Sequence, residues 1–194
     1  MKKELLYLNY ALVLAGGIGR RMGAGIPKQF IEINGKPIII YSLEVLTGHP
    51  EIDGVFVVCI ESWREQLLAN IKKFNIPKVI DVLPQGNSRR ESSYIGVKAV
   101  AKHSLNPEGD IVLIHDAARP MLTADIISRN ISDAEKYGGC ETVCSMNDTV
   151  IRSQGEFTES ISDIVPRNEL ARVQTPQSFK VAGIFAAHEY YRKA

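Results

Sequence analysis

The sequence has no marked excess of charge of either sign and no long apolar run. Its 194 residues include 23 Lys or Arg and 22 Asp or Glu, which leaves a formal net charge of +1. A chain this close to neutral lacks a general electrostatic attraction to nucleic acid or to an anionic membrane. No segment approaches the roughly 20 apolar residues that span a bilayer, and the first ten residues lack the apolar region of a signal peptide. We therefore expect a soluble protein that binds neither nucleic acid nor membranes.

Cysteine is also scarce, and the three examples are Cys59, Cys140 and Cys144. A small, odd number of cysteines indicates free thiols in a cytoplasmic protein rather than a disulfide framework. Cys140 and Cys144 have no further cysteine or histidine near them in the sequence. A zinc site is therefore not expected, and packing within strands is the better interpretation. The length and the 45% of hydrophobic residues suit one folded domain spanning residues 1–194.

Short apolar runs alternate with helical patterns along the chain. We predict strands at the apolar runs, and helices where apolar residues recur every three or four positions. Buried strands separated by helices are typical of an α/β fold, with a mostly parallel sheet that helices cover on both faces. The predicted strands are 10–15, 55–60, 78–83, 111–114 and 141–145, and the predicted helices lie around 63–71, 91–103 and 123–131.

Residues 149–165 depart from this pattern, because they are more polar than the core strands. Two extended segments flank Gln154 and Gly155, which suit the turn of a β-hairpin. Such an arm, at about 148–166, could project from the domain and pair with a second subunit, or it could lie on its own domain. The residues alone leave both arrangements open.

The most informative motif follows the first predicted strand, where a glycine-rich loop carries several cations. Glycine lets the backbone approach a ligand closely, and backbone N–H groups and cationic side chains suit phosphate oxygens. Two common phosphate motifs are excluded. Met22 occupies the third glycine position of the dinucleotide fingerprint, and Pro37 follows Gly35-Lys36 where a P-loop requires serine or threonine. A long loop with a lysine near its far end can instead wrap around a triphosphate. The glycines are Gly16, Gly17, Gly19, Gly23 and Gly25, and the cations are Arg20, Arg21 and Lys28.

A second polar cluster follows the third predicted strand, at residues 84–93. Ligands in open α/β sheets bind beyond the carboxyl ends of the strands, so this position favours a binding role. Gly86 allows close backbone approach, while Asn87 and Ser88 can cap the next helix. A plain helix cap with exposed arginines is the simpler alternative for this segment.

A third cluster, His-Asp-Ala-Ala-Arg-Pro at residues 115–120, follows the fourth predicted strand. Asp116 stands where a carboxylate can reach a magnesium ion held by phosphates, because this ion prefers oxygen ligands and keeps several waters. Arg119 could contact a substrate, or it could simply pair with Asp116.

These motifs, in this order, resemble one family over essentially the whole chain. The first motif is Leu-Ala-Gly-Gly-Ile-Gly-Arg-Arg-Met-Gly…Pro-Lys-Gln-Phe, and the second is His-Asp-Ala-Ala-Arg-Pro. The last, near the C-terminus, is Pro-Arg-Asn-Glu-Leu…Gln-Thr-Pro-Gln-Ser-Phe. The resemblance is to the cytidylyltransferases that activate polyol phosphates, which include those acting on 2-C-methyl-D-erythritol 4-phosphate and on ribitol 5-phosphate. It implies a Rossmann-like nucleotidyltransferase fold, the substrates CTP and a polyol phosphate, Mg²⁺, and a homodimer formed through the arm.

The resemblance also assigns roles to residues. It implies that Arg21, Lys28 and Arg167 serve catalysis and that Asp116 binds the metal. The CTP contacts that it implies are Ala15, Gly16, Gly17, Gly19, Arg21, Lys28, Gly86, Asn87, Ser92 and Asp116. The contacts to the polyol phosphate are Arg119, Thr149, Arg167 and Thr175. Two positions depart from the methylerythritol-phosphate pattern, with Gln85 where a second glycine is common and Asn87 where aspartate is common.

The acceptor is the least determined part of this interpretation. Pro166-Arg167 favours the ribitol-phosphate type, because methylerythritol-phosphate enzymes typically have Asp-Arg there, whereas Asp-Ala-Ala-Arg-Pro leans the other way. Family members usually continue for a few tens of residues beyond the position of Ala194, so we expect the C-terminal end of the family domain to be absent. A CTP-binding regulator without turnover is the alternative from another class. A dinucleotide-dependent oxidoreductase is weaker, since the glycine spacing fails.

Overall fold

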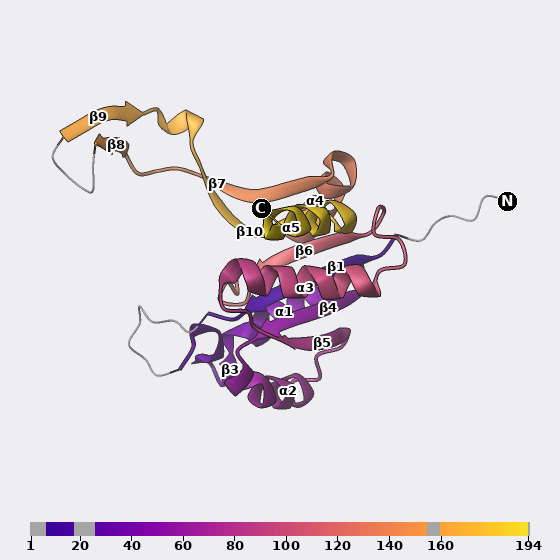
Figure 1. Ribbon diagram of the computed structural model, residues 1–194. Coiled ribbons are helices and arrows are strands. Elements are labelled where there is room, and N and C mark those ends of the chain that lie inside the picture. Colours follow the sequence, from indigo (N-terminus) through magenta and orange to yellow (C-terminus); the bar gives the residue numbers. More distant parts are fainter. Residues whose placement is uncertain (1–6, 18–25, 155–159, 194) are drawn as a thin grey trace.

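The computed structural model describes residues 7–17, 26–154 and 160–193. It is built around one six-stranded sheet (Figure 1). The strand order is β5-β4-β1-β6-β10-β7. The first four of these are mutually parallel, while β10 runs antiparallel to both β6 and β7. The prediction of a mostly parallel sheet is therefore confirmed. The strands are β1 (Asn9–Ala15), β4 (Gly54–Cys59), β5 (Val79–Pro84), β6 (Ile111–Asp116), β7 (Gly139–Ser145) and β10 (Ala171–Lys180).

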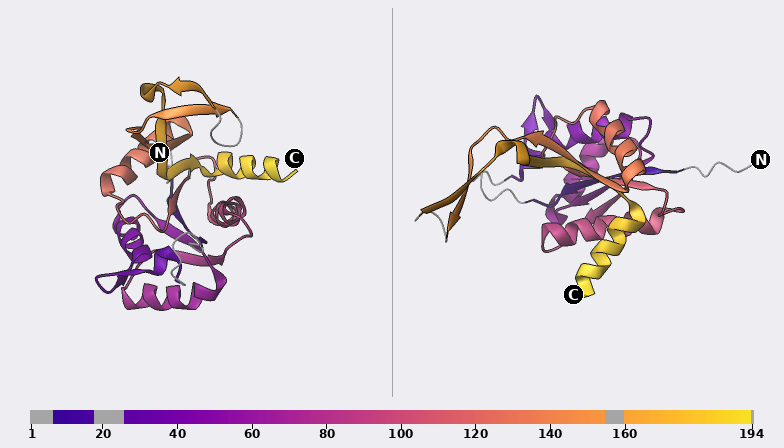
Figure 2. Two further views of the ribbon diagram at one scale, coloured as in Figure 1. Left: turned by 90° about the vertical axis from the view of Figure 1, so that its left-hand side faces the viewer. Right: turned by 90° about the horizontal axis from the view of Figure 1, so that it is seen from above.

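Helices cover both faces of this sheet, because each face carries its own apolar cluster (Figure 2). One cluster joins the sheet to α1 (Ile38–Gly48), α2 (Arg64–Lys73) and α4 (Ala124–Tyr137). The other joins it to α3 (Arg89–His103) and α5 (Val181–Lys193). The remaining elements are short, namely η2 (Lys28–Phe30), β2 (Glu32–Ile33), β3 (Lys36–Pro37), η3 (Glu61–Trp63) and η4 (Arg167–Glu169).

The predicted arm is a separate two-stranded antiparallel sheet of β8 (Val150–Gln154) and β9 (Ser160–Val165). Figures 1 and 2 show it extending away from the rest of the chain, which agrees with a projecting arm rather than a hairpin lying on its own domain. Gln154 ends β8, while the predicted turn residue Gly155 lies outside the described residues.

Strand β10 is the main element that the sequence pattern did not predict. It is ten residues long and includes Gln174, Pro176 and Gln177, so its polar residues obscure the apolar run of a core strand. The strand is nevertheless central, because it lies between β6 and β7. Its register with β7 shifts between Val173 and Gln177. Pro176 lies in this interval, and a proline inside a sheet is tolerated at such an irregularity because it has no N–H to donate.

The three cysteines are unpaired, with Cys59 buried in β4 and Cys140 and Cys144 half-buried in β7. This agrees with the prediction of packing within strands. Among the described residues, no helix combines the length and the apolar character that crossing a bilayer demands.

Candidate active site

The polar segments that follow β1, β5 and β6 lie at one edge of the sheet, because these parallel strands point the same way. Gly16 shows how closely the first two segments approach. A methyl group built on its Cα would lie 3.2 Å from Oε1 of Gln85 and 3.5 Å from Oγ of Ser92. The structure therefore brings the start of the glycine-rich loop against the second segment predicted to contact CTP.

The far end of the glycine-rich loop is held by Gln29, a residue that the sequence analysis did not single out. Its side chain is buried, and its amide nitrogen donates hydrogen bonds to the carbonyl oxygens of Ala15 (2.7 Å) and Gly17 (3.1 Å). Phe30 stacks on Trp63 at 4.7 Å between ring centroids. These contacts fix η2, and with it the half-buried Lys28, relative to the end of β1. The predicted loop residues Gly19 and Arg21, together with Arg20, Gly23 and Gly25, lie outside the described residues.

The segment after β5 is organised around the first turn of α3. Ser88 is the N-cap, and its Oγ accepts a hydrogen bond from the backbone N–H of Glu91 (3.1 Å). Of the two predicted capping residues, Ser88 is therefore the cap, while the backbone N–H of Asn87 donates to the Glu91 carboxylate (2.7 Å). The Gly86 N–H donates to Oγ of Ser92 at 3.0 Å. A Cβ at Gly86 would lie 2.4 Å from Cγ of Glu91, which explains the need for glycine at this turn.

Asp116, at the C-terminal end of β6, is the electrostatic centre of the site. One carboxylate oxygen accepts from the Arg89 guanidinium and the other from Nε of Arg119, both at 3.2 Å. Arg119 also donates to the side-chain oxygen of Gln174 on β10. The Asp116–Arg119 pair considered from the sequence is thus present. However, Arg89 joins it, and two guanidinium groups around one carboxylate leave the cluster with net positive charge that suits an anionic substrate.

His115 and Thr175 form a buried connection beneath this cluster. His115 is 1% exposed, and its ring nitrogens lie 3.1 Å from the carbonyl oxygen of Arg119 and 3.1 Å from Oγ1 of Thr175. The Asp116 N–H donates to the same Thr175 oxygen at 3.3 Å. Burial lowers the pKa of His115 below its usual value, because the interior disfavours the imidazolium. Sequence analysis did not assign His115 a role of its own.

A cavity of about 350 Å³ opens beside this group. It offers both polar groups and an apolar wall, as sites for small organic ligands usually do. Its lining residues are His115, Arg119, Pro120, Met121, Leu122, Ile126, Thr142, Gln174 and Thr175. The predicted acceptor residues Arg119 and Thr175 therefore share one cavity.

The other two predicted acceptor residues lie elsewhere, at the base of the arm. Arg167 begins η4 and donates to the carbonyl oxygen of Asn147 (3.1 Å), while Thr149 directly precedes β8. Both are exposed. Among the hydrogen bonds between described residues, none joins either side chain to the Asp116 cluster.

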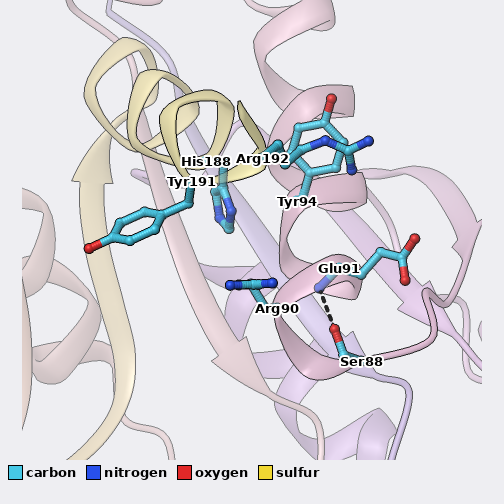
Figure 3. Close-up of a pocket in the computed structure, with 7 residues that line it drawn as sticks. All are labelled: Ser88, Arg90, Glu91, Tyr94, His188, Tyr191 and Arg192. Carbon is cyan, nitrogen blue, oxygen red and sulfur yellow. Dashed lines mark hydrogen bonds between the residues drawn. The ribbon is translucent and has the colours of Figure 1, made fainter. Parts of the chain in front are cut away.

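A smaller cavity of about 160 Å³ lies between α3 and α5 (Figure 3). The Arg192 guanidinium lies 4.1 Å from the centroid of the Tyr94 ring on its border, and Arg90 and His188 also line it. Of the segment that follows β5, Ser88 lines this cavity, whereas the predicted CTP contacts Gly86 and Ser92 do not.

The side chains near Asp116 would suit only a magnesium site that substrate phosphates and water complete. The described residues contain no group of three or more His, Cys, Asp or Glu side chains that could hold a metal ion. Magnesium needs no such cage, because one carboxylate, substrate phosphates and water can complete its ligands. The Asp116 side chain is 29% exposed and so is accessible, but an ion would have to displace a guanidinium from it.

Comparisons with known proteins agree with this geometry. A family model described as 2-C-methyl-D-erythritol 4-phosphate cytidylyltransferase (IspD) matches residues 10–194. A ribitol-5-phosphate cytidylyltransferase of Lacticaseibacillus paracasei is 38% identical, with 92% of this chain and 75% of that protein covered. A 2-C-methyl-D-erythritol 4-phosphate cytidylyltransferase of Clostridium botulinum is 39% identical, with coverage of 95% and 78%.

Solved structures show the same fold. The 4-diphosphocytidyl-2C-methyl-D-erythritol synthase of Anaerococcus prevotii aligns with a TM-score of 0.81 at 23% identity, over 97% of this chain and 78% of that one. A second synthase of that name aligns with a TM-score of 0.75 at 28% identity, over 95% and 80%. The chain belongs to the 2-C-methyl-D-erythritol 4-phosphate cytidylyltransferase family and is a CTP-dependent nucleotidyltransferase.

Proposed function

We propose that this enzyme transfers CMP from CTP to the phosphate of ribitol 5-phosphate or a related pentitol phosphate, giving a CDP-polyol and pyrophosphate. The main structural support for this transfer is the cluster of Arg89, Asp116 and Arg119 beside the cavity of about 350 Å³. The cluster offers cations for phosphates, and the cavity beside it offers space for a small polyol. The choice of ribitol rests on Pro166-Arg167 and on the Lacticaseibacillus relative's name.

We place the nucleotide between the C-terminal ends of β1 and β5. Gly16 and Gly17 allow the triphosphate to approach the backbone, and Lys28 and Arg21 contact its phosphates. Gly86, Asn87 and Ser92 contact the base and ribose. Open space at Gly17 supports this placement, because a Cβ built there would meet no described atom within 4 Å. The neighbouring Gly16 lies directly against Gln85 and Ser92, which joins the two segments.

The reaction is an in-line displacement at the α-phosphorus of CTP. An oxygen of the acceptor phosphate forms the new P–O bond while the bond to pyrophosphate breaks, and pyrophosphate leaves with the electron pair. The acceptor phosphate is already ionised near neutral pH, so the reaction requires no general base. The enzyme's task is to hold two anions in contact and to stabilise the charge that develops.

Each side of the reaction has its own cations. Lys28 and Arg21 stabilise the α-phosphate and the leaving pyrophosphate, while Arg119, Arg167, Thr149 and Thr175 hold the polyol phosphate. Magnesium, when bound through Asp116, supplies further positive charge to the triphosphate. We also propose a cytoplasmic enzyme, which the three unpaired cysteines support.

An acceptor assay tests the proposal directly. The protein is incubated with CTP and Mg²⁺ plus either ribitol 5-phosphate or 2-C-methyl-D-erythritol 4-phosphate, and released pyrophosphate is measured. We expect kcat/KM for ribitol 5-phosphate to be at least tenfold higher than kcat/KM for 2-C-methyl-D-erythritol 4-phosphate. A reversed ratio would assign the enzyme to isoprenoid-precursor synthesis, which the Clostridium relatives and Asp-Ala-Ala-Arg-Pro favour. CTP binding without pyrophosphate release from either acceptor would instead indicate a regulator.

We propose further that the arm joins two copies into a homodimer. Ile151 lies opposite Ile164 in the hairpin, and Ser153 lies opposite Ile161. Opposite residues point to the same face, so all three isoleucines share one face of the arm. They are 47% to 63% exposed. A two-stranded hairpin with an uncovered apolar face is marginally stable alone, which supports burial against a second copy.

Charge on this face is expected to break the dimer. Two isoleucines buried at an interface contribute about 3–6 kcal/mol to association, so Ile161→Glu/Ile164→Glu should shift the mass from dimer to monomer in analytical ultracentrifugation. Arg152→Glu, on the opposite face of the same hairpin, is the matched control and should stay dimeric. A wild-type chain that sediments as a monomer at micromolar concentration would contradict the proposal.

A further inference from the structure

We infer that His115 is a positioning residue for the acceptor side of the reaction, which it serves by holding Thr175 and the backbone of Arg119 in place. This inference rests on the proposed function, and it assigns a role to a side chain that is only 1% exposed and acts through its two hydrogen-bond partners. His115 is the penultimate residue of the core strand β6, and its two ring nitrogens bond to two different segments of the acceptor cavity.

The direction of these hydrogen bonds follows from the chemistry of the partners. The carbonyl oxygen of Arg119 can only accept, so the His115 nitrogen 3.1 Å away, Nε2, carries the proton. A buried imidazole without a carboxylate partner is costly to charge, so Nδ1 is an acceptor and the Thr175 hydroxyl donates to it. Thr175 in turn accepts from the Asp116 N–H.

This chain of bonds specifies how Thr175 meets the acceptor. Its single hydroxyl proton is committed to His115, and one lone pair is committed to the Asp116 N–H. The lone pair that remains can accept a hydrogen bond but cannot give one, so Thr175 contacts a hydroxyl of the polyol rather than an oxygen of its phosphate. The phosphate is left to the guanidinium groups, whose planar donors suit it.

The second bond of His115 acts on Arg119. The carbonyl oxygen of Arg119 accepts from His115 and also from Oγ of Ser42 (3.3 Å), which fixes the backbone where the chain leaves the sheet. The Arg119 side chain is then directed between Asp116 and Gln174. His115 thus aligns both the donor for the phosphate and the acceptor for a hydroxyl, in one cavity.

A purely structural histidine would affect both substrates alike, so the test compares their Michaelis constants. His115→Ala should raise KM for ribitol 5-phosphate by about tenfold, as the loss of a well-placed hydrogen bond does, while KM for CTP changes less than threefold. His115→Asn places its amide oxygen near the position of Nδ1. It can still accept from Thr175, so it should recover part of the loss.

Variants of Thr175 keep the inference testable if His115→Ala does not fold. Thr175→Val removes the hydroxyl at nearly constant volume and should reproduce the tenfold rise, whereas Thr175→Ser should not. In the His115→Ala background, Thr175→Val should add little, because the two residues act as one unit. Fully additive losses, or equal rises in both Michaelis constants, would overturn the inference.

The role of His115 can be tested even if the proposed acceptor is wrong. If the wild-type protein prefers 2-C-methyl-D-erythritol 4-phosphate, the same comparison is made with that acceptor, because both compounds carry hydroxyl groups. If neither acceptor is turned over, calorimetric titration of each polyol phosphate into the CTP-bound protein measures the same ratios. Binding of the acceptor that His115→Ala and Thr175→Val leave unchanged would then contradict the role of His115.

Discussion

Replacing Lys28 with alanine is expected to lower kcat by two to three orders of magnitude with little change in thermal stability. The loss follows from transition-state electrostatics, because removing one well-placed donor from a site where charge develops costs about 10²–10³ in rate. Lys28 is suited to such a role because its position is held by its neighbours. Gln29 bonds to both carbonyls at the start of the loop, and Phe30 packs on Trp63.

Stability should change little because the Lys28 side chain makes no hydrogen bond or ion pair with another described residue. The measurements are steady-state pyrophosphate release and the midpoint of thermal unfolding. Lys72→Ala is the matched control, since it removes the same charge from the exposed surface of α2, and it should leave both values unchanged. A Lys28→Ala enzyme with near-normal kcat would show that the glycine-rich loop is not the catalytic segment.

The second large effect is expected for Asp116→Asn, which should lower kcat by about 10²-fold or more and weaken the dependence of the rate on Mg²⁺. Asparagine keeps the size of the side chain but not its charge, so the two guanidinium groups lose their anionic partner, as would the magnesium ion that we propose. Arg89 and Arg119 would then lie beside a neutral group and bind a substrate phosphate in a different geometry. The measurements are kcat and the Mg²⁺ concentration for half-maximal rate.

Folding should survive this substitution. Both arginines are more than 40% exposed, and ion pairs in such settings contribute roughly 0–1 kcal/mol. Asp125→Asn is the control, because it breaks another Asp–Arg pair at 3.2 Å, on the exposed surface of α4. If Asp116→Asn and Asp125→Asn had the same small effect on rate, Asp116 would serve only as a structural partner of the two arginines, close to the simpler Asp116–Arg119 pairing that the sequence offered.

Much of the proposed nucleotide side of the site could be predicted from the sequence. The strands β1, β4, β5 and β6 are short apolar runs, and in a parallel sheet their carboxyl ends meet at one edge. The residues after each run are therefore brought together whatever the details of packing. Gly16, Ser92 and Asp116 lie where that reasoning places them.

The proposed acceptor side was harder to predict because it depends on contacts between residues far apart in the chain. Strand β10 combines polar side chains with a proline, so its position between β6 and β7 is determined by pairing on both edges rather than by its own composition. That pairing brings Gln174 to Arg119 and Thr175 to His115. The sequence motif that contains Thr175 indicates the residue but does not predict which residues it contacts.

Gln29 shows the same limit on a smaller scale. A glutamine between a lysine and an aromatic residue carries no local signal, and its importance appears only when it is buried with its amide facing two carbonyl oxygens. The sequence by itself determined the α/β class, the family and the three segments that meet at the sheet edge, because strand pattern and loop composition are local properties. The tertiary structure alone decided which side chains hold these segments, since a buried hydrogen bond depends on where two distant parts of the chain come to lie.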